Sequence, residues 1–459
     1  MLTSLDFLTP GQTWPPKSER ERLKRYRDNR LLFEGKHHVV FKEIWTRLFR
    51  NELQLSVEIC LNWPKRLSTL WADLLLGEPP VVADATNDKN TDYLSNLEKD
   101  TSLWLKSYTG ALDCSRFGDA VFKIRRDKHG KVKVSVIPPC FWFPVVSVDD
   151  AKEIEYHVIG YANSELGEGS TANKLHVEIH SDSEVIFRTY SLPINTGMQD
   201  YATIGNLIEE RREKNEIGLN YVVNVSNLST SDSIYGIDDY DDLTSIMQEI
   251  EVRFAQIARV LDKHADPKMY GPDMVTTDPE TGVTRANFGD YIPIGLDGEN
   301  PPGYITWDGH LDMSFMQIEK MMNQFFMLSE TSPAMFGDVK NGLAESGSAL
   351  KRLMMAPLAK VNRVRMNFDK GLREVLKVMV ALDGHSDVVA EIDWQDGLPN
   401  DETERTQNEA TAVSAGITSK WSAVKRLYSL SDKQADEEMA LIDEESSVTT
   451  EPDNPLVGE

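Results

Sequence analysis

Two amphipathic patterns flank a segment rich in turn residues, and this arrangement constrains the fold more than any other feature of the sequence. From Leu243 to Leu261, apolar residues recur at a period near 3.6, which predicts a helix with one apolar stripe. Residues 311–330 (LDMSFMQIEKMMNQFFMLSE) predict a second helix with a broad face of Met and Phe. The intervening residues 268–310 contain DPETG and GLDGENPPG between short β-like runs. The sequence therefore predicts two helical rods joined by a small β insertion.

Composition places these rods in a large folded protein. The 459 residues exceed one ordinary core, and 40% hydrophobic with 27% charged residues is typical of a folded chain. The net charge of −25 argues against a protein that grips nucleic acid, because gripping requires an excess of Lys and Arg. An acidic wall would instead let a polyanion slide past without sticking.

Cysteine usage indicates a reducing compartment, and the lack of long apolar runs argues against a signal peptide and a membrane span. Cys60, Cys114 and Cys140 show no paired spacing, which argues against a disulfide framework or a zinc cluster. The opening MLTSLDFLTPGQTWPP has no basic region followed by an apolar run, so we expect no signal peptide. The apolar run Leu74–Leu76 is far below the ~20 residues of a membrane span. We therefore expect synthesis and folding in the cytoplasm.

The residues before the first rod predict a lobe of mixed α and β structure. The charged segment 17–36 predicts a helix with a solvated face, and Pro64 begins a helix that Gly77 ends. Residues 119–139 predict a hairpin with its turn at Asp127 to Gly130. Further strands are predicted at 153–162, 174–182 and 184–192.

The second rod leads into a loop with two glycines and then a long helix. The stretch NGLAESGSALKR (341–352) resembles a phosphate-binding loop, but the required Lys is missing and no buried strand precedes it. We interpret it as a flexible connection after which Ser346 begins a basic helical pattern that reaches Leu382. Pro357 lies inside that pattern and predicts a kink. Beyond residue 400 follow two or three short acidic helices, with Gly416 ending one and Ser419 capping the next.

Two clusters deserve a chemical interpretation. His176, Glu178 and His180 would share one face of a strand and could bind zinc or iron; the alternative is a solvent-facing strand edge with Val177 and Ile179 turned inward. The second cluster could bind calcium or magnesium, but a cap that complements the dipole of the first rod fits better; its members are Asp238, Asp239, Asp241 and Asp242.

Four stretches follow one another in an order shared with a known family. They are NWPKRLSTLWADLLLGEPP, YGIDDYDDLTSIMQEIEVRFAQIARVLDKHADPKMYG, SGSALKRLMMAPLAKVNRVRMNFDKGL, and a closing acidic stretch from DWQDGLPNDETERTQ to QADEEMALIDEE. With the order of lobe, rod, β insertion, rod and long helix, they make the chain similar to the portal proteins of tailed bacteriophages. The resemblance covers about residues 55–445 and does not extend to the first 50 residues or to the tail from about 446.

The resemblance implies an α+β portal fold divided into named parts. These are the wing (1–235), a first stem helix (236–265), the clip (266–309), a second stem helix (310–335), the tunnel loop (336–348), a long kinked wing helix with a return strand (349–399), the crown (400–445) and a disordered acidic tail (446–459).

It also implies a structural role without catalysis, cofactor, metal or membrane. Portal proteins form a ring, usually of twelve subunits, at one vertex of the capsid. The ring is a conduit for double-stranded DNA during packaging and ejection, without sequence specificity. It docks the large subunit of the packaging terminase and head-completion or adaptor proteins, and it meets the major capsid and scaffolding proteins. The expected location is the virion, after assembly in the cytoplasm of a bacterial host.

The resemblance assigns residues to two surfaces. The DNA-facing tunnel loop would comprise Asp338, Lys340, Asn341, Gly342, Glu345, Ser346, Gly347, Lys351 and Arg352. Of these, Lys340, Lys351 and Arg352 are the candidates to meet DNA; the alternative is a solvated or intersubunit ion pair for each. Contacts between subunits along the stem would involve Ile246, Ile250, Phe254, Ile257, Met316, Met321 and Phe325.

Two other functions compete with the portal hypothesis. One is another viral structural protein, such as a minor head protein or a head–tail adaptor, although these are usually shorter and lack the order of helix, β insertion and helix. The other is a metal-dependent hydrolase that uses His176, Glu178 and His180.

Overall fold

The computed structural model describes most of the chain. The described residues are 1–42, 59–85, 90–162, 174–192, 201–265, short pieces of 269–304, 311–336, 354–385, 387–394, 402–428, 430 and 432–448. They fall into two compact units, Met1–Gln395 and Asp396–Glu459. Among the described residues, no helix combines the length and apolarity needed to cross a lipid bilayer.

A five-stranded antiparallel sheet forms one part of the first unit. Its strand order is β10-β8-β7-β6-β5, with bounds β5 Trp142–Val146, β6 Ile154–Ala162, β7 Lys174–His180, β8 Glu184–Ser191 and β10 Leu207–Lys214. Alternate residues of β7, namely Leu175, Val177 and Ile179, are buried in one core cluster with Trp14 and Phe143. These strands confirm the α+β character of the lobe, and the three strands predicted between residues 153 and 192 are all present.

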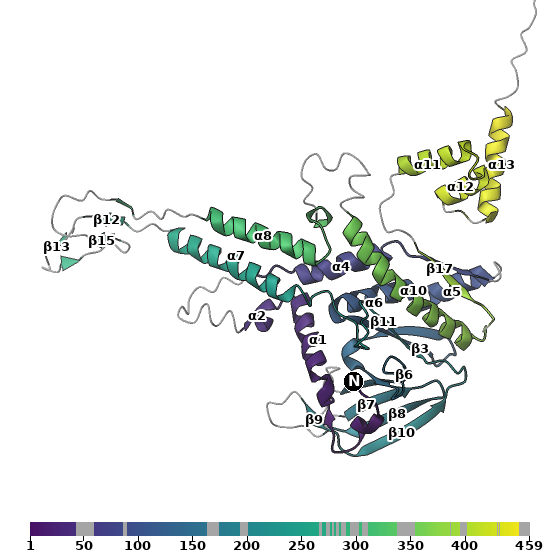
Figure 1. Cartoon of the computed structure of the whole chain (residues 1–459), viewed down its shortest axis with the longest axis horizontal. Coiled ribbons are helices and arrows are strands. Elements are labelled where there is room, and N and C mark those ends of the chain that lie inside the picture. Colours follow the sequence, from purple (N-terminus) through teal and green to yellow (C-terminus); the bar gives the residue numbers. More distant parts are fainter. Residues whose placement is uncertain are drawn as a thin grey trace, which may run out of the picture. The chain divides into compact units, whose positions relative to one another are not determined.

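A second sheet carries the main core. It has the order β11-β3-β4, with bounds β3 Asp119–Arg126, β4 Val132–Ile137 and β11 Val222–Ser226. The hairpin of β3 and β4 turns at Asp127 to Gly130, as its sequence predicts. Helices α6 (Leu103–Phe117) and α10 (Met355–Asp383) pack on this sheet, and Phe122 and Phe368 are fully buried in the shared core (Figure 1).

Shorter elements complete the first unit. Two strand pairs join residues distant in sequence: β1 (Thr13–Trp14) with β9 (Ala202–Thr203), and β2 (Val81–Asp84) with the return strand β17 (Ala390–Asp393). The remaining helices here are α2 (His37–Val40), α4 (Trp63–Leu76) and α5 (Thr91–Thr101). In α4, Pro64 lies at the start and Gly77 at the end, as predicted.

Helix α1 (Arg20–Phe33) lies within the range predicted as a charged helix, and it has a buried side as well as the predicted solvated face. Tyr26 and Leu32 are buried, and so is Glu19, which directly precedes the helix. The Arg22 guanidinium donates to Glu19 at 2.8 Å and to the backbone oxygen of Trp142 at 3.0 Å. The solvated face is present, because Glu21, Lys24, Arg27 and Arg30 are exposed, whereas Glu19 and Arg22 are paired inside the lobe.

Helix α10 is long, and its described part begins at Met355. Pro357 lies in the first turn of this helix and not in its interior. In the first turn, backbone N–H groups lack intrahelical partners, so a proline there costs little. A kink at Pro357 in the middle of a helix is therefore not what the described helix shows. The predicted start at Ser346 lies outside the described residues.

The insertion between the two rods contains short strands, which confirms its predicted β character. Strand β12 (Met269–Gly271) pairs in parallel with β15 (Tyr291–Pro293) and antiparallel with β16 (Gly303–Tyr304). A separate pair consists of β13 (Thr276–Thr277) and β14 (Thr284–Arg285).

The second unit contains three short helices, α11 (Glu402–Ser414), α12 (Lys420–Tyr428) and α13 (Asp432–Val448). Gly416 follows α11 with a φ of +70°, and the Ser419 hydroxyl accepts from the N–H of Ser422 at 3.1 Å, so both predicted helix boundaries are confirmed. Helix α13 continues to Val448, past the predicted end of the crown at 445, so a disordered tail from 446 was placed too early.

Gly371 sets how closely α10 approaches the second sheet. A Cβ atom at this position would lie 2.3 Å from a methyl carbon of Val225. We predict that Gly371→Ala lowers the unfolding free energy by about 1–3 kcal/mol, because overpacking outweighs the gain in helix propensity. Val225→Ala added to Gly371→Ala should recover part of the loss in a urea titration. Strict additivity of the two single changes would contradict the predicted clash.

Candidate functional site: the two-helix stem

Helices α7 (Thr244–Ala265) and α8 (Asp312–Leu328) form the predicted rods and pack side by side. We call these two helices the stem. Figure 1 shows them running along each other, with the β12 to β16 insertion connecting their ends. Both helices are amphipathic, as the spacing of their apolar residues predicts.

The apolar stripe of α7 packs against residues of the same chain. Ile250 and Ile257 of α7 share one core cluster with Ile318 and Phe325 of α8. The ring of Phe325 lies 4.7 Å from that of Trp63 in α4, measured between centroids. The stripe therefore fixes the stem to itself and to the lobe.

This packing revises the expected subunit contacts. Three of those residues, Ile250, Ile257 and Phe325, are buried within the single chain, and three more are partly buried against the same core, namely Ile246, Phe254 and Met321. Met316 differs, because 51% of its surface is exposed. Of the seven stem residues, Met316 is the most exposed, and the three partly buried residues offer a smaller surface to a neighbouring subunit.

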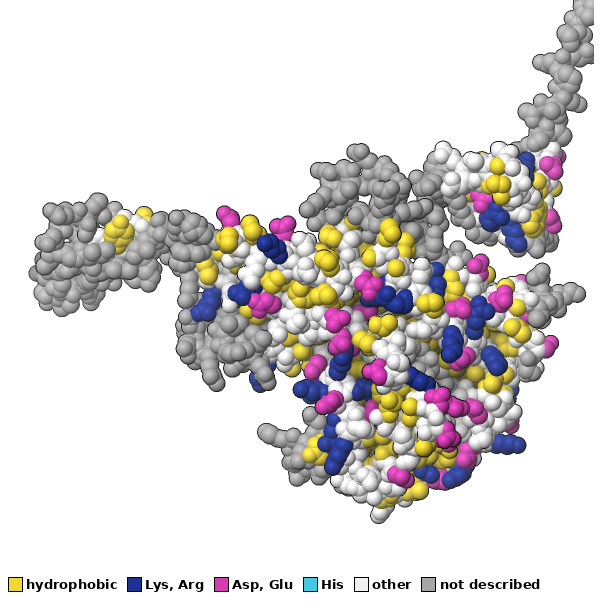
Figure 2. Space-filling model, viewed as in Figure 1, with side chains coloured by type: hydrophobic (Ala, Val, Ile, Leu, Met, Phe, Trp, Pro, Cys, Tyr) yellow, Lys and Arg dark blue, Asp and Glu magenta, His cyan; other side chains and the backbone are white. Residues whose placement is uncertain are grey.

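Helix α8 presents further apolar residues to solvent. Figure 2 shows hydrophobic side chains at the surface over the stem. We call the exposed set on one side of the helix the outer face of α8; it consists of Met313, Met316, Met327 and Leu328, each about half exposed or more. Phe315 is also exposed, but its position in the helical turn places it on a different side. Exposed apolar patches of this kind mark interaction sites more often than isolated surface apolar residues do.

The acidic cluster before α7 is occupied by cations of the protein itself. Asp238 lies 2.6 Å from Nε of Arg25, and Asp239 lies 2.8 Å from Nζ of Lys360 in α10. Arg25 also pairs with Asp241 at 2.7 Å. A calcium or magnesium site is therefore not favoured here, because these contacts already neutralise the carboxylates.

The helix-cap interpretation of the same cluster is only partly right. Helix α7 begins at Thr244 and has no acidic residue in its first turn. The aspartates of the cluster therefore precede the helix and do not complement its dipole from inside the first turn. Asp238 instead accepts from the backbone N–H of Tyr240 at 2.9 Å, one turn before the helix. Tyr240 is fully buried and donates its hydroxyl to the backbone oxygen of Pro64 at 2.9 Å, which fixes the base of the stem to α4.

The proposed metal triad on β7 is used for an ion pair. Strand β7 lies in the interior of its sheet and is not an edge, although Val177 and Ile179 do point inward as the alternative predicted. Glu178 lies 3.0 Å from Nζ of Lys123 and 3.1 Å from Nε2 of His180. Burial raises the pKa of Glu178, but the hydrogen bond from His180 and the charge of Lys123 outweigh it and lower the pKa to about 2. Among the described residues, no group of three potential ligands includes this triad.

The predicted tunnel loop lies outside the described residues, which end at Phe336 and resume at Met354. That gap contains every residue assigned to DNA contact: Asp338, Lys340, Asn341, Gly342, Glu345, Ser346, Gly347, Lys351 and Arg352. Their role stays a prediction.

Sequence reasoning missed a buried carboxylate at the base of the stem. Asp119 is fully buried and accepts from the N–H of Gly236 at 3.1 Å and from the hydroxyl of Ser226 at 3.0 Å. Burial raises the pKa of Asp119 to about 6, against the lowering effect of those two donors. The only sequence signal is its position directly after Gly118, where a helix gives way to a strand.

Comparison with known proteins gives one family. The family model described as phage portal protein, SPP1 Gp6-like, matches residues 16–451. A comparison with curated protein sequences gives no significant match.

Similar solved structures come from gene transfer agent particles. A chain of the virion of a native particle is 13% identical with a TM-score of 0.46, covering 83% of this chain and 92% of its own. A chain from the neck of the native particle computed with C12 symmetry is 12% identical with a TM-score of 0.47, covering 79% and 89%. One from the neck of the empty particle computed with C6 symmetry is 12% identical with a TM-score of 0.48, covering 83% and 93%. The match to the family model over residues 16–451 is the basis for assigning this chain to a family.

Asp119 gives a prediction about pH. Its pKa rises from an ordinary value near 3.8 to about 6 on folding, so its ionisation between these values destabilises the folded state. The resulting loss as pH rises from about 4 to about 7 amounts to about 2 kcal/mol, and Asp119→Asn should abolish it. Urea unfolding of the wild type and the variant at both pH values measures this. The exposed Asp149→Asn is the matched control, and an equal effect of Asp119→Asn at both pH values would contradict the prediction.

Proposed function

We propose that this chain, which belongs to the SPP1 Gp6-like phage portal protein family, assembles into a ring of identical subunits at one vertex of a virus particle. The observation that carries the proposal is the family match, which spans the lobe, the stem, the long helix and the C-terminal helices. It favours a portal over a head–tail adaptor or a hydrolase, and the pairing of Glu178 with Lys123 argues further against the hydrolase.

The outer face of α8 supports the ring. The stripe of α7 is satisfied within the chain, whereas α8 leaves Met313 and Met316 exposed. In a ring, a heterologous contact repeats around the axis, so one such face per subunit meets a different surface on its neighbour. The family resemblance implies twelve subunits.

The ring would serve as a conduit for double-stranded DNA and as a docking platform. An acidic chain with a net charge of −25 disfavours tight binding of a moving duplex, and the basic residues of the tunnel loop would make local, sequence-independent contacts with phosphates. The clip (266–309) would meet the large subunit of the packaging terminase and later the head-completion proteins, and the capsid and scaffolding proteins would surround the wing. The location would be the virion, after assembly in the host cytoplasm.

Replacing Met316 tests the ring surface. Met316→Glu places a charge on the outer face of α8, and we expect at least a tenfold lower population of rings because a buried unpaired charge is costly at an interface. The melting temperature of the single chain should change little, since the side chain is already half exposed. Mass photometry and negative-stain microscopy measure the outcome.

The control for that experiment is Val148→Glu. Val148 is an exposed apolar residue of the lobe, 83% exposed and far from the stem in sequence. It should leave ring formation unchanged. Normal rings of Met316→Glu would show that the outer face of α8 does not form the subunit contact.

Deleting Val339–Glu345 tests the DNA conduit. The loop connects two helical segments, so its removal should leave rings intact while packaging or retention of DNA falls. A particle-based packaging assay measures this, with ring formation as the internal control. Unimpaired packaging by rings that lack the loop would remove its proposed role.

A further inference from the structure

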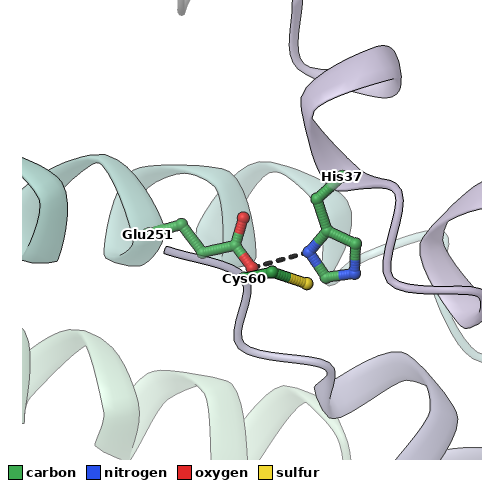
Figure 3. Close-up of side chains that lie close together, drawn as sticks. All are labelled: His37, Cys60 and Glu251. Atoms are coloured by element: carbon green, nitrogen blue, oxygen red, sulfur yellow. Dashed lines mark hydrogen bonds and ion pairs between the residues drawn. The ribbon is translucent and has the colours of Figure 1, made fainter. Parts of the chain in front are cut away.

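Three potential metal ligands meet at the base of the stem. His37 begins α2, Cys60 precedes α4, and Glu251 belongs to α7. One nitrogen, one sulfur and one carboxylate oxygen of these residues lie within 4.8 Å of one another. Figure 3 shows the three side chains converging from separate segments. His37 and Glu251 are buried, and Cys60 is exposed, so the cluster opens to solvent on one side.

Both ring nitrogens of His37 lie within hydrogen-bonding distance of an oxygen atom, but a neutral imidazole carries only one N–H. Its Nε2 lies 2.9 Å from the backbone oxygen of Leu32, which can only accept. Its Nδ1 lies 2.6 Å from Oε1 of Glu251, an oxygen that already accepts from the N–H of Leu61 at 2.9 Å. A neutral imidazole carries one N–H and can serve only one of these two acceptors. Either one proton lies between Nδ1 and Oε1, held by the imidazole as an ion pair or by the carboxyl group, or a metal ion lies between Nδ1 and the carboxylate.

The second oxygen of Glu251 distinguishes these two states. Oε2 is buried and has no hydrogen-bond partner among the described residues, although Glu251 is only 1% exposed. An ion pair with His37 leaves this oxygen unsatisfied, which is costly in a buried site. A metal ion would bind one carboxylate oxygen and the neighbouring sulfur of Cys60, and a water ligand on that ion would donate a hydrogen bond to the other oxygen, Oε2. The donation of Nε2–H to a backbone carbonyl is also the arrangement that orients metal-ligating histidines.

We propose that Nδ1 of His37, Sγ of Cys60 and the carboxylate of Glu251 bind one zinc ion, with water as the fourth ligand. Thiolate, imidazole and carboxylate are zinc ligands, and a thiolate disfavours magnesium and calcium. Tetrahedral bonds of about 2.0 to 2.3 Å hold the ligand atoms about 3.3–3.8 Å apart. On binding zinc, the distance of 2.6 Å between Nδ1 of His37 and Oε1 of Glu251 would increase by about 1 Å. The longest distance among the three ligand atoms, which is within 4.8 Å, would decrease by about 1 Å.

Charge and protons balance in this site. Without metal, His37 and Glu251 share one proton in the contact between Nδ1 and Oε1 and are together neutral, and Cys60 carries its thiol proton. Binding of Zn²⁺ releases that shared proton and the one on Sγ of Cys60. The two positive charges of the ion are then offset by the thiolate and the carboxylate. The cluster is electroneutral before and after binding, which suits its partly buried position.

The zinc ion would act as a clamp. It connects α2 and the segment before α4, which belong to the lobe, to the stem helix α7. Because zinc binds the folded arrangement and not the unfolded chain, it would stabilise the base of the stem in the single subunit. This role is independent of ring formation and does not rest on the portal proposal.

The experiment measures zinc in the full-length protein by inductively coupled plasma mass spectrometry after dialysis against zinc-containing and then metal-free buffer. We expect about one zinc per chain in the wild type. Cys60→Ser and His37→Gln should lose it, and Cys140→Ser, which removes another thiol that is not fully buried, should keep it. Chelation should lower the melting temperature of the wild type and of Cys140→Ser but not that of Cys60→Ser.

A second measurement covers the case in which His37→Gln fails to fold. Cys60 is exposed, so Cys60→Ser should fold normally by circular dichroism. Cobalt(II) added to the metal-free protein should give a thiolate-to-metal charge-transfer absorption in Cys140→Ser that is absent in Cys60→Ser. Equal zinc in both cysteine variants would overturn the proposal. So would folded wild type that binds no zinc and shows no thermal shift with added zinc, which would leave an ion pair only.

Discussion

The close approach of two backbone segments at Gly118 and Gly236 holds the lobe and the stem together. A Cβ atom on Gly118 would lie 2.2 Å from the backbone oxygen of Gly236, and one on Gly236 would lie 2.0 Å from the backbone oxygen of Gly118. Gly118 has a φ of +88°, which glycine adopts without the strain that a side chain would cause. This contact brings the chain that enters α7 against the junction of α6 and β3. A side chain at either position would force these two segments apart.

Burying backbone this closely requires that its polar groups be satisfied, and the charged residues around the contact do this. Asp119 accepts from the N–H of Gly236, and Asn227 donates to the carboxylate of Asp239 at 2.9 Å. Lys360 pairs with Asp239 and lies over the ring of Trp71 at 4.2 Å. Removing one partner would leave a buried charge, which costs more than the pair contributes. The long helix α10, the stem and α4 are therefore joined through one network of paired charges.

Periodicity predicted the elements well and their partners poorly. The stripe from Leu243 to Leu261 located the start of α7 to within one residue and its end to within four, and the boundaries at Gly416 and Ser419 followed from local capping chemistry. Periodicity shows that a face is buried but not what covers it. Ile250 and Phe325 were therefore assigned to a neighbouring subunit, whereas they pack within one chain.

Buried charges were harder to predict for a related reason. Tyr235 donates to Glu19 across 216 residues of sequence, and Arg22 reaches the backbone of Trp142 across 120. No local pattern distinguishes such a charge from a solvated one, because its partner is known only once the fold is known. The same holds for His37, Cys60 and Glu251, which come from three separate segments and show no ligand spacing in the sequence.

The division of apolar residues in the stem has a consequence for assembly. Because the stripe of α7 packs against α8 within the chain, a subunit would be able to fold before it meets its neighbours. In the proposed ring, the outer face of α8 would remain for association, and its Met side chains would adapt to an irregular partner surface at little cost in packing. A protein that folded only on assembly would instead leave Ile250 and Phe325 exposed in the single chain. If the ring forms as proposed, folding and association would use different faces of the same two helices, and a substitution could then impair one process and leave the other intact.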